Sequence, residues 1–109
     1  MARKIVEALE NKKAEDIVLM DITGISQFTD YFIICSATSE RMLQSLSQIV
    51  INTAKQGYKK IAKVGGKSFQ GWITLDYGDL VVHVFAEKVR NYYQLEDLWA
   101  AGKMLLRVK

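Results

Sequence analysis

The sequence predicts a single α/β (α+β) domain over residues 1–109, built on one mixed sheet of about five strands flanked by helices. Its 109 residues leave room for only one packed core. Half of the residues are hydrophobic and 25% are charged, which is typical of a folded globular protein. The hydrophobic periodicity runs in the order helix, strand, strand, helix, three strands, helix, and no proline or Ser/Gly tract marks a linker.

The first three elements are predicted at residues 2–11, 16–22 and 30–36. Residues 2–11 form a helix with one apolar face, and the face consists of Ile5, Val6 and Leu9. Residues 16–22 are a short apolar strand that ends before Gly24. Residues 30–36 are apolar on both faces, which indicates a strand in the centre of a sheet covered on both sides.

A long helix and an edge strand follow. The helix is predicted over residues 38–57, with Thr38 as its N-cap and Glu40 in its first turn. Its apolar positions recur at helical spacing; they are Met42, Leu43, Leu46, Ile49, Val50 and Ala54. Residues 58–64 are predicted to be an edge strand, since lysines there would discourage pairing with another sheet.

The last third of the chain contains a predicted hairpin and a final helix. Residues 71–76 and 79–85 are the two strands, and Tyr77-Gly78 is the turn between them. The final helix begins near Glu87 and ends at Gly102. Its broad apolar face is Val89, Tyr92, Leu95, Leu98 and Trp99. Residues 103–109 are a possible tail.

The hairpin has two chemically different faces. In its simplest register the opposing pairs are Asp76 with Asp79, Thr74 with Val81, and Trp72 with His83. Because side chains alternate, one face is polar and aromatic, and the other is core made of Ile73, Leu75, Leu80, Val82 and Val84. If the first face is exposed to solvent, Trp72 suits the anchor of a protein interface. Two alternatives stay open: Trp72 packs beneath a helix with a half-buried His83, or a longer loop moves the register.

Charge is unevenly distributed around the hairpin. The formal net charge is +3, which is lower than in a protein whose main task is to grip phosphates. Residues 55–67 hold no acid and five lysines, namely Lys55, Lys59, Lys60, Lys63 and Lys67, whereas residues 68–87 hold three acids and no Lys or Arg. A basic partner could be steered to the hairpin and the lysines could lie near phosphates, or the lysines could be only a solvated surface.

No catalytic or metal-binding pattern is complete. The segment Gly66-Lys67-Ser68 ends like a phosphate-binding loop, but Ile61 occupies the position of the first required glycine. Two turn aspartates with His83 are a weak set for metal binding or acid–base work. The one cysteine, Cys35, lies in an apolar strand, where an inert buried thiol is expected. We therefore expect no enzymatic activity, no cofactor and no metal.

The chain resembles the ribosomal silencing factor family, also called the Iojap or RsfS family, from the first helix through Trp99. The resemblance is carried by residues 13–17 (KAEDI), 29–34 (TDYFII) followed by Thr38-Ser39, 72–85 (WITLDYGDLVVHVF) and 93–99 (YQLEDLW). Each piece alone is weak, but their order and spacing together are specific. The family's usual proline and acid after the hairpin are Ala86-Glu87 here, and the glycine loop, which is often more acidic in relatives, carries Lys67.

The resemblance implies a nucleotidyltransferase-like fold that works by association. Family members bind the large ribosomal subunit at universal ribosomal protein L-fourteen, prevent the small subunit from joining, and lower translation when nutrients are short. The partner-binding residues that it implies here are Trp72, Asp76, Tyr77, Asp79 and His83, extended by Tyr93 and Glu96. A nearby contact with ribosomal RNA and a homodimer are further expectations.

Two other functions compete with this interpretation. A residual nucleotidyltransferase-like enzyme would need a Gly-Ser phosphate loop, and residues 36–39 supply no glycine there. An RNA-binding module would use the lysines of residues 55–67 and would bind naked RNA with a steep salt dependence. A cytoplasmic protein without a membrane partner is expected, because residues 1–11 lack the apolar block of a signal peptide.

Overall fold

The computed structural model describes residues 1–109 and contains one mixed six-stranded sheet in the order β3-β4-β5-β2-β1-β6. Along the chain the elements are α1 (Ala2–Asn11), β1 (Glu15–Asp21), β2 (Tyr31–Ala37), α2 (Glu40–Tyr58), β3 (Lys63–Lys67), the 3-10 turn η1 (Ser68–Gln70), β4 (Trp72–Asp76), β5 (Leu80–Ala86), α3 (Glu87–Tyr93), α4 (Leu95–Leu98) and β6 (Lys103–Val108). Only β2 and β5 pair in parallel. The predicted fold class is confirmed, with one strand more than expected.

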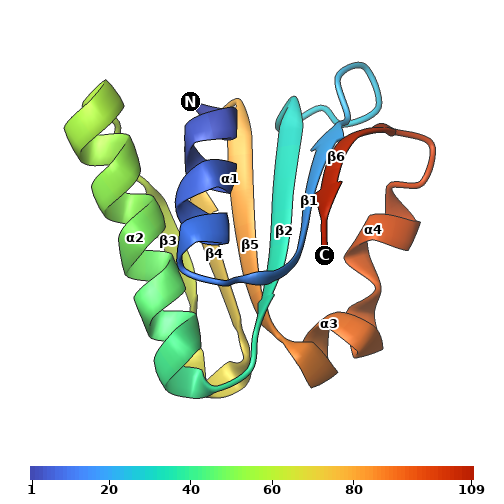
Figure 1. The fold of residues 1–109 in the computed structure, drawn as a ribbon. Helices are drawn as coiled ribbons and strands as arrows, with labels where there is room; N and C mark the ends of the chain where they lie inside the picture. Colours follow the sequence, from blue (N-terminus) through green and yellow to red (C-terminus); the bar gives the residue numbers. More distant parts are fainter.

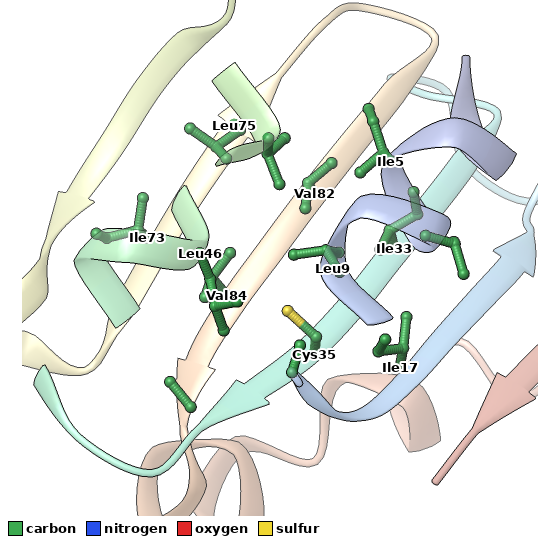
Figure 2. Close-up of a cluster of buried hydrophobic side chains, with 14 of the residues drawn as sticks. Ile5, Leu9, Ile17, Ile33, Cys35, Leu46, Ile73, Leu75, Val82 and Val84 are labelled. Carbon is green, nitrogen blue, oxygen red and sulfur yellow. The ribbon is translucent and has the colours of Figure 1, made fainter. Parts of the chain in front are cut away.

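Helices α1 and α2 cover one face of the sheet (Figure 1). Their apolar stripes bury the larger of two cores, in which Ile5 and Leu9 of α1 and Leu46 of α2 meet side chains of the central strands (Figure 2). All three are at most 1% exposed. Burying such a side chain contributes roughly 1.5–3 kcal/mol, so this face supplies much of the stability.

The opposite face is only partly covered, by the short helices α3 and α4 (Figure 1). They close a smaller core whose buried members are Val18, Met20, Ile22, Phe32, Ile34, Phe85 and Leu95. Strand β2 contributes to both cores, with Ile33 and Cys35 on one face and Phe32 and Ile34 on the other. The prediction of a central strand buried on both sides is therefore confirmed.

Both ends of α2 differ by one residue or more from the prediction. Ser39 caps the helix by accepting a hydrogen bond from the Met42 amide at 3.1 Å, while the predicted cap, Thr38, donates to the Met42 sulfur instead. At the other end the helix continues through Tyr58, and Lys59 then takes a left-handed conformation with φ of 55°.

The prediction of an edge strand at residues 58–64 is wrong in position. Because α2 extends further than expected, the chain returns to the sheet later, and β3 spans Lys63–Lys67. This strand contains two glycines that a sequence pattern would count against it. A Cβ at Gly65 would lie 2.6 Å from the Thr74 hydroxyl, and Gly66 has a φ of 80°, so the pairing with β4 needs both of them.

The final helix and the tail are also corrected. Gln94 has a φ of 49° and divides the predicted helix into α3 and α4, so the helical period does not continue across it. Leu95 packs on the sheet as expected, but Tyr92 is 80% and Leu98 is 73% exposed. Residues 103–109 are no tail, since β6 pairs with β1 and closes what would otherwise be an open sheet edge.

Measured against the thickness of a bilayer, none of the helices has the length and apolar content to span a membrane.

Candidate functional site

The hairpin β4–β5 positions the candidate site, and its register differs from the simplest one. The observed pairs are Trp72 with Phe85, Thr74 with His83, and Asp76 with Val81. The loop has three residues, Tyr77 to Asp79, and is closed by a hydrogen bond of 2.8 Å from the Tyr77 amide to the Leu80 carbonyl. The register is shifted by two residues, and because side chains alternate with a period of two, each side chain keeps its predicted face. The predicted core face is buried as expected.

Trp72, the first residue of β4, is half-buried. Its indole nitrogen donates a hydrogen bond of 3.1 Å to Nδ1 of His83. Its ring centroid lies 4.8 Å from that of Phe85 and 4.9 Å from that of Tyr93. The side chain is thus fixed by neighbours on β5 and α3 while part of it faces solvent, which is the arrangement of a pre-organised interface anchor.

His83 does not reach the surface, contrary to the expectation of an exposed partner-binding residue. It is 7% exposed, and burial lowers the pKa of its imidazole to about 4. Because Nδ1 accepts from Trp72, the neutral ring carries its proton on Nε2, and that buried atom has no hydrogen-bond partner. His83 acts on the surface only by holding Trp72.

Two carboxylates lie at the hairpin loop. Asp76 and Asp79 are exposed, and an Asp76 oxygen accepts the Gly78 amide at 2.8 Å. The Asp79 carbonyl accepts the amides of Asp30 and Tyr31, both at 3.0 Å, so the loop is tied to the start of β2. Asp79 thus belongs to the loop instead of to a strand face.

Tyr77 points away from the predicted contact surface. Its ring packs against the core beneath α1 and α2, its hydroxyl is buried without a partner, and burial raises its pKa. The hydrophobic effect overrides the turn position here, since the loop is long enough to fold the ring back onto the sheet. Tyr77 is therefore not beside Trp72.

The two residues predicted to extend the surface have different environments. Tyr93 is 48% exposed and lies against Trp72, so it belongs to the same surface. The Glu96 side chain is 20% exposed and pairs with Arg90 at 3.2 Å. Its charge is therefore compensated within the chain, and Glu96 stabilises the α3–α4 segment instead of offering a free carboxylate.

Arg90 is the important residue that sequence reasoning missed. It is 4% exposed, and its guanidinium donates to the Ser36 hydroxyl at 2.9 Å, to the Asp16 carbonyl and to Glu96. The Asp16 carboxylate in turn accepts two hydrogen bonds of 2.8 Å from Arg107 of β6. This Arg90 network joins α3, α4, β1, β2 and β6. Its members are up to 91 residues apart, so no local sequence pattern could predict it.

The Arg90 network also sets the charge state of Asp16. Burial by itself would raise the pKa of this carboxyl group. The hydrogen bond from Arg107 and the charges of Arg90 and Arg107 outweigh burial, and the pKa of Asp16 falls below its usual value. The carboxylate stays ionised at neutral pH and keeps both arginines in place.

A half-open groove of about 530 Å³ runs beside the anchor, between β3–β4 and α3. Its lining residues are Gly66, Gln70, Trp72, Thr74, Val89 and Tyr93. Two aromatic rings form apolar walls, and Gln70 and Thr74 supply polar groups. The groove can receive a side chain of another protein, and its position joins the anchor to the lysine-bearing edge of the sheet.

The other groups that the sequence singled out do not join this site. Cys35 is fully buried in the first core, and burial raises the pKa of its thiol to about 12, as expected for an inert cysteine. No three His, Cys, Asp or Glu side chains are placed to hold a metal ion together.

Comparison with known sequences identifies the relatives of this chain. A family model described as "Ribosomal silencing factor during starvation" matches residues 1–108. The ribosomal silencing factor RsfS of Bacillus subtilis is 39% identical over 92 residues, which cover 84% of this chain and 78% of the relative. The RsfS protein of Haemophilus influenzae is 36% identical, with 88% and 94% covered.

Organellar proteins are also among the relatives. A mouse protein named "Mitochondrial assembly of ribosomal large subunit protein 1" is 31% identical over 98 residues, which cover 87% of this chain but 43% of the mouse protein. The additional length of that protein lies outside the shared domain.

Solved structures share the fold. The crystal structure of a Chromobacterium violaceum protein superimposes with a TM-score of 0.85 at 31% identity, covering 91% of this chain and 82% of that one. A Bacillus halodurans crystal structure gives a TM-score of 0.78 at 34% identity, with 99% and 95% covered. With the family model matched over residues 1–108, these likenesses show that the chain belongs to the ribosomal silencing factor (RsfS) family.

Proposed function

We propose that this protein silences translation by binding the large ribosomal subunit through universal ribosomal protein L-fourteen and sterically blocking the small subunit, so that translation falls when nutrients are limited. Relatives named as ribosomal silencing factors support the ribosome as the partner. The observation that carries the proposal is the surface around Trp72, a fixed and partly exposed indole next to a groove and an acidic loop.

Each part of this surface has a role in association. The part of Trp72 that is exposed, with Tyr93 beside it, offers apolar area at little entropic cost because the two rings are already in contact. Asp76 and Asp79 lie at the loop, where exposed carboxylates would attract a basic ribosomal protein and speed the encounter. The bound protein would then exclude the other subunit by its volume alone, so the proposed mechanism uses no catalysis and no cofactor.

Cosedimentation with separated ribosomal subunits tests the proposal. We expect the protein to pellet with large subunits, to stay in the supernatant with small subunits, and to lower the yield of joined ribosomes. Trp72→Ala should abolish this effect, whereas Phe28→Ala, which truncates an 89% exposed aromatic residue on the β1–β2 loop, should not. Binding to small subunits, or joining at the normal yield with the protein bound, would contradict the proposal.

Two further measurements address the remaining expectations. Titration with nucleoside triphosphate and magnesium should give neither binding nor turnover if the protein acts only by association. The homodimer stays a prediction, which sedimentation equilibrium of the purified chain checks.

A further inference from the structure

The five lysines of residues 55–67 are exposed side chains that the proposed function does not use. This lysine strip, namely Lys55, Lys59, Lys60, Lys63 and Lys67, follows the end of α2, the loop after it and the edge strand β3. Every one of them is exposed. The ion pairs of the structure join other residues, so none of the five charges is neutralised by a partner within the chain.

Two of the lysines, both on strand β3, project from the same face of the sheet as Trp72. Lys63 is paired opposite Asp76, and Lys67 is paired opposite Trp72, so both side chains project on the Trp72 face. They are four residues apart, which is about 13 Å along a strand. Gly65 lies between them without a side chain, and beside Lys63 the surface has a hollow of about 160 Å³ whose lining also includes Thr74 and the acidic residue Asp76. An extended chain could therefore lie close to the backbone between two ammonium groups.

Few acidic side chains lie close to the lysine strip. Asp76 lies across from Lys63 without forming an ion pair with it, and Glu40 at the start of α2 accepts a hydrogen bond from Ser68 at 3.2 Å. The local charge is thus clearly positive. Protein interfaces are depleted in lysine, and lysines on an edge strand oppose the addition of another strand. A polyanion suits this surface better than a protein does.

We propose that the lysine strip binds the phosphodiester backbone of RNA without reading its sequence. The ammonium groups would displace counterions from successive phosphates, which gives an affinity that falls steeply with salt. The choice of RNA over other polyanions rests on the proposed function, since a ribosomal subunit presents RNA beside its proteins. The contact itself goes beyond that function, because it requires no ribosomal protein.

Fluorescence anisotropy of the full chain with a labelled 20-nucleotide oligouridine, at 50 to 300 mM KCl, tests the proposal. The double variant Lys63→Gln/Lys67→Gln removes two charges from the strip. We expect its Kd at 100 mM KCl to rise about fivefold or more, and the slope of log K against log salt to shrink by about 1.4, at ~0.7 per phosphate contact of a single strand. Lys63→Arg/Lys67→Arg should retain both values.

The matched control is Lys103→Gln/Lys109→Gln, which removes the same charge at the opposite, β6 edge of the sheet. An equal loss in the control, or an unchanged slope in the strip variant, would overturn the proposal. So would a strip variant that loses affinity for isolated ribosomal protein L-fourteen and keeps its affinity for RNA, since the strip would then dock a protein. Binding of oligouridine without any binding to large subunits would refute the proposed function and leave this inference standing.

Discussion

The contact between Trp72 and His83 decides how the surface is built. A buried imidazole that accepts from the indole fixes the direction of the ring, and Phe85 and Tyr93 pack on its sides. Phe32 approaches His83 edge-on with a centroid distance of 4.7 Å. An exposed aromatic side chain alone would sample several rotamers, whereas this one is held before any partner arrives.

His83 should make stability depend on pH. Its pKa is about 4 in the folded state and 6.5 in the unfolded chain, so the unfolded state binds the proton first as pH falls. The stabilisation is complete above pH 6.5 and is lost toward pH 4. Between pH 7 and pH 5 the free energy of unfolding should fall by about 2 kcal/mol from this group, at 1.36 kcal/mol per pKa unit. Urea denaturation at the two pH values measures the fall.

The variant His83→Asn supplies the control for this prediction. Its amide oxygen can accept from the Trp72 indole but does not titrate in this range. The free energy of unfolding of this variant should change much less between pH 7 and pH 5 than that of the parent. If the free energy of unfolding falls as much in the variant as in the parent, another group titrates and His83 is not the cause.

Trp72 and Asp79 should contribute to binding in different ways. Trp72→Ala removes the proposed anchor, and truncation of a central aromatic residue of an interface typically costs ~2 kcal/mol or more and mainly accelerates dissociation. Asp79→Asn removes an exposed charge from the loop, so it should cost less and mainly slow association at low salt. Surface plasmon resonance with immobilised L-fourteen resolves the two rate constants.

Folding must survive both substitutions for this comparison, and circular dichroism provides the check. If Trp72→Ala unfolds the chain, the conservative Trp72→Phe keeps the packing and loses the hydrogen bond to His83. If both variants fold and bind as the parent does, the surface that contacts the ribosomal protein lies elsewhere on the molecule.

Helices α3 and α4 are too short to be stable alone, so tertiary contacts must hold them. Leu95 inserts into the smaller core, and Trp99 lies edge-on to Phe32 at 5.6 Å. Arg90 ties the same segment to β1 through Asp16 and to β2 through Ser36, and Asp16 in turn binds Arg107 of β6. The position of Tyr93 beside Trp72 therefore depends on the buried guanidinium of Arg90, one turn earlier in α3.

Arg90→Met should destabilise the protein by roughly 3 kcal/mol, because it leaves the Glu96 carboxylate and the Ser36 hydroxyl without their partner. Removing an exposed charge from the same helix, as in Glu87→Gln, should cost less than about 0.5 kcal/mol. Thermal unfolding followed by the Trp fluorescence compares the two variants. Equal stability of both would show that the buried contacts contribute nothing net.

Arg90 also predicts a coupling between the network and the surface. If the network positions Tyr93, then Arg90→Lys, which keeps the charge but not the forked geometry, should accelerate dissociation from L-fourteen while the chain remains folded. A folded Arg90→Lys variant with parental binding rates would limit Arg90 to a structural role.

At the scale of the whole molecule, the sheet depends on its last strand. β6 covers the outer edge of β1, its Leu106 and Val108 pack against the larger core, and its Arg107 binds Asp16. Deletion of residues 103–109 should lower the free energy of unfolding by several kcal/mol, since strand pairing, apolar burial and an ion pair disappear together. Deletion of Lys109 alone should have little effect. A full deletion without loss of stability would restore the interpretation of this segment as a tail.

Local patterns were sufficient for the elements that bury a regular stripe. The apolar face of α1, the doubly buried β2 and the alternation in β4 and β5 were predicted because each repeats with the period of its own backbone. The division of the hairpin into two faces survived an error of register, since a shift by two residues preserves parity. The prediction that Trp72 lies on the face of the hairpin opposite the larger core also came from this alternation.

What the sequence by itself determined is therefore the one-sheet fold, its core faces and the family, through residues 13–17, 29–34 with Thr38-Ser39, 72–85 and 93–99 together. Tertiary structure alone decided that His83 and the Tyr77 hydroxyl are buried, that Glu96 is paired, and that residues 103–109 complete the sheet. The physical reason is distance along the chain. Arg90 and Asp16 are 74 residues apart, and β1 pairs with β6 from the C-terminal end of the chain. Neither contact follows a local hydrophobic period, so a sequence pattern could not predict it.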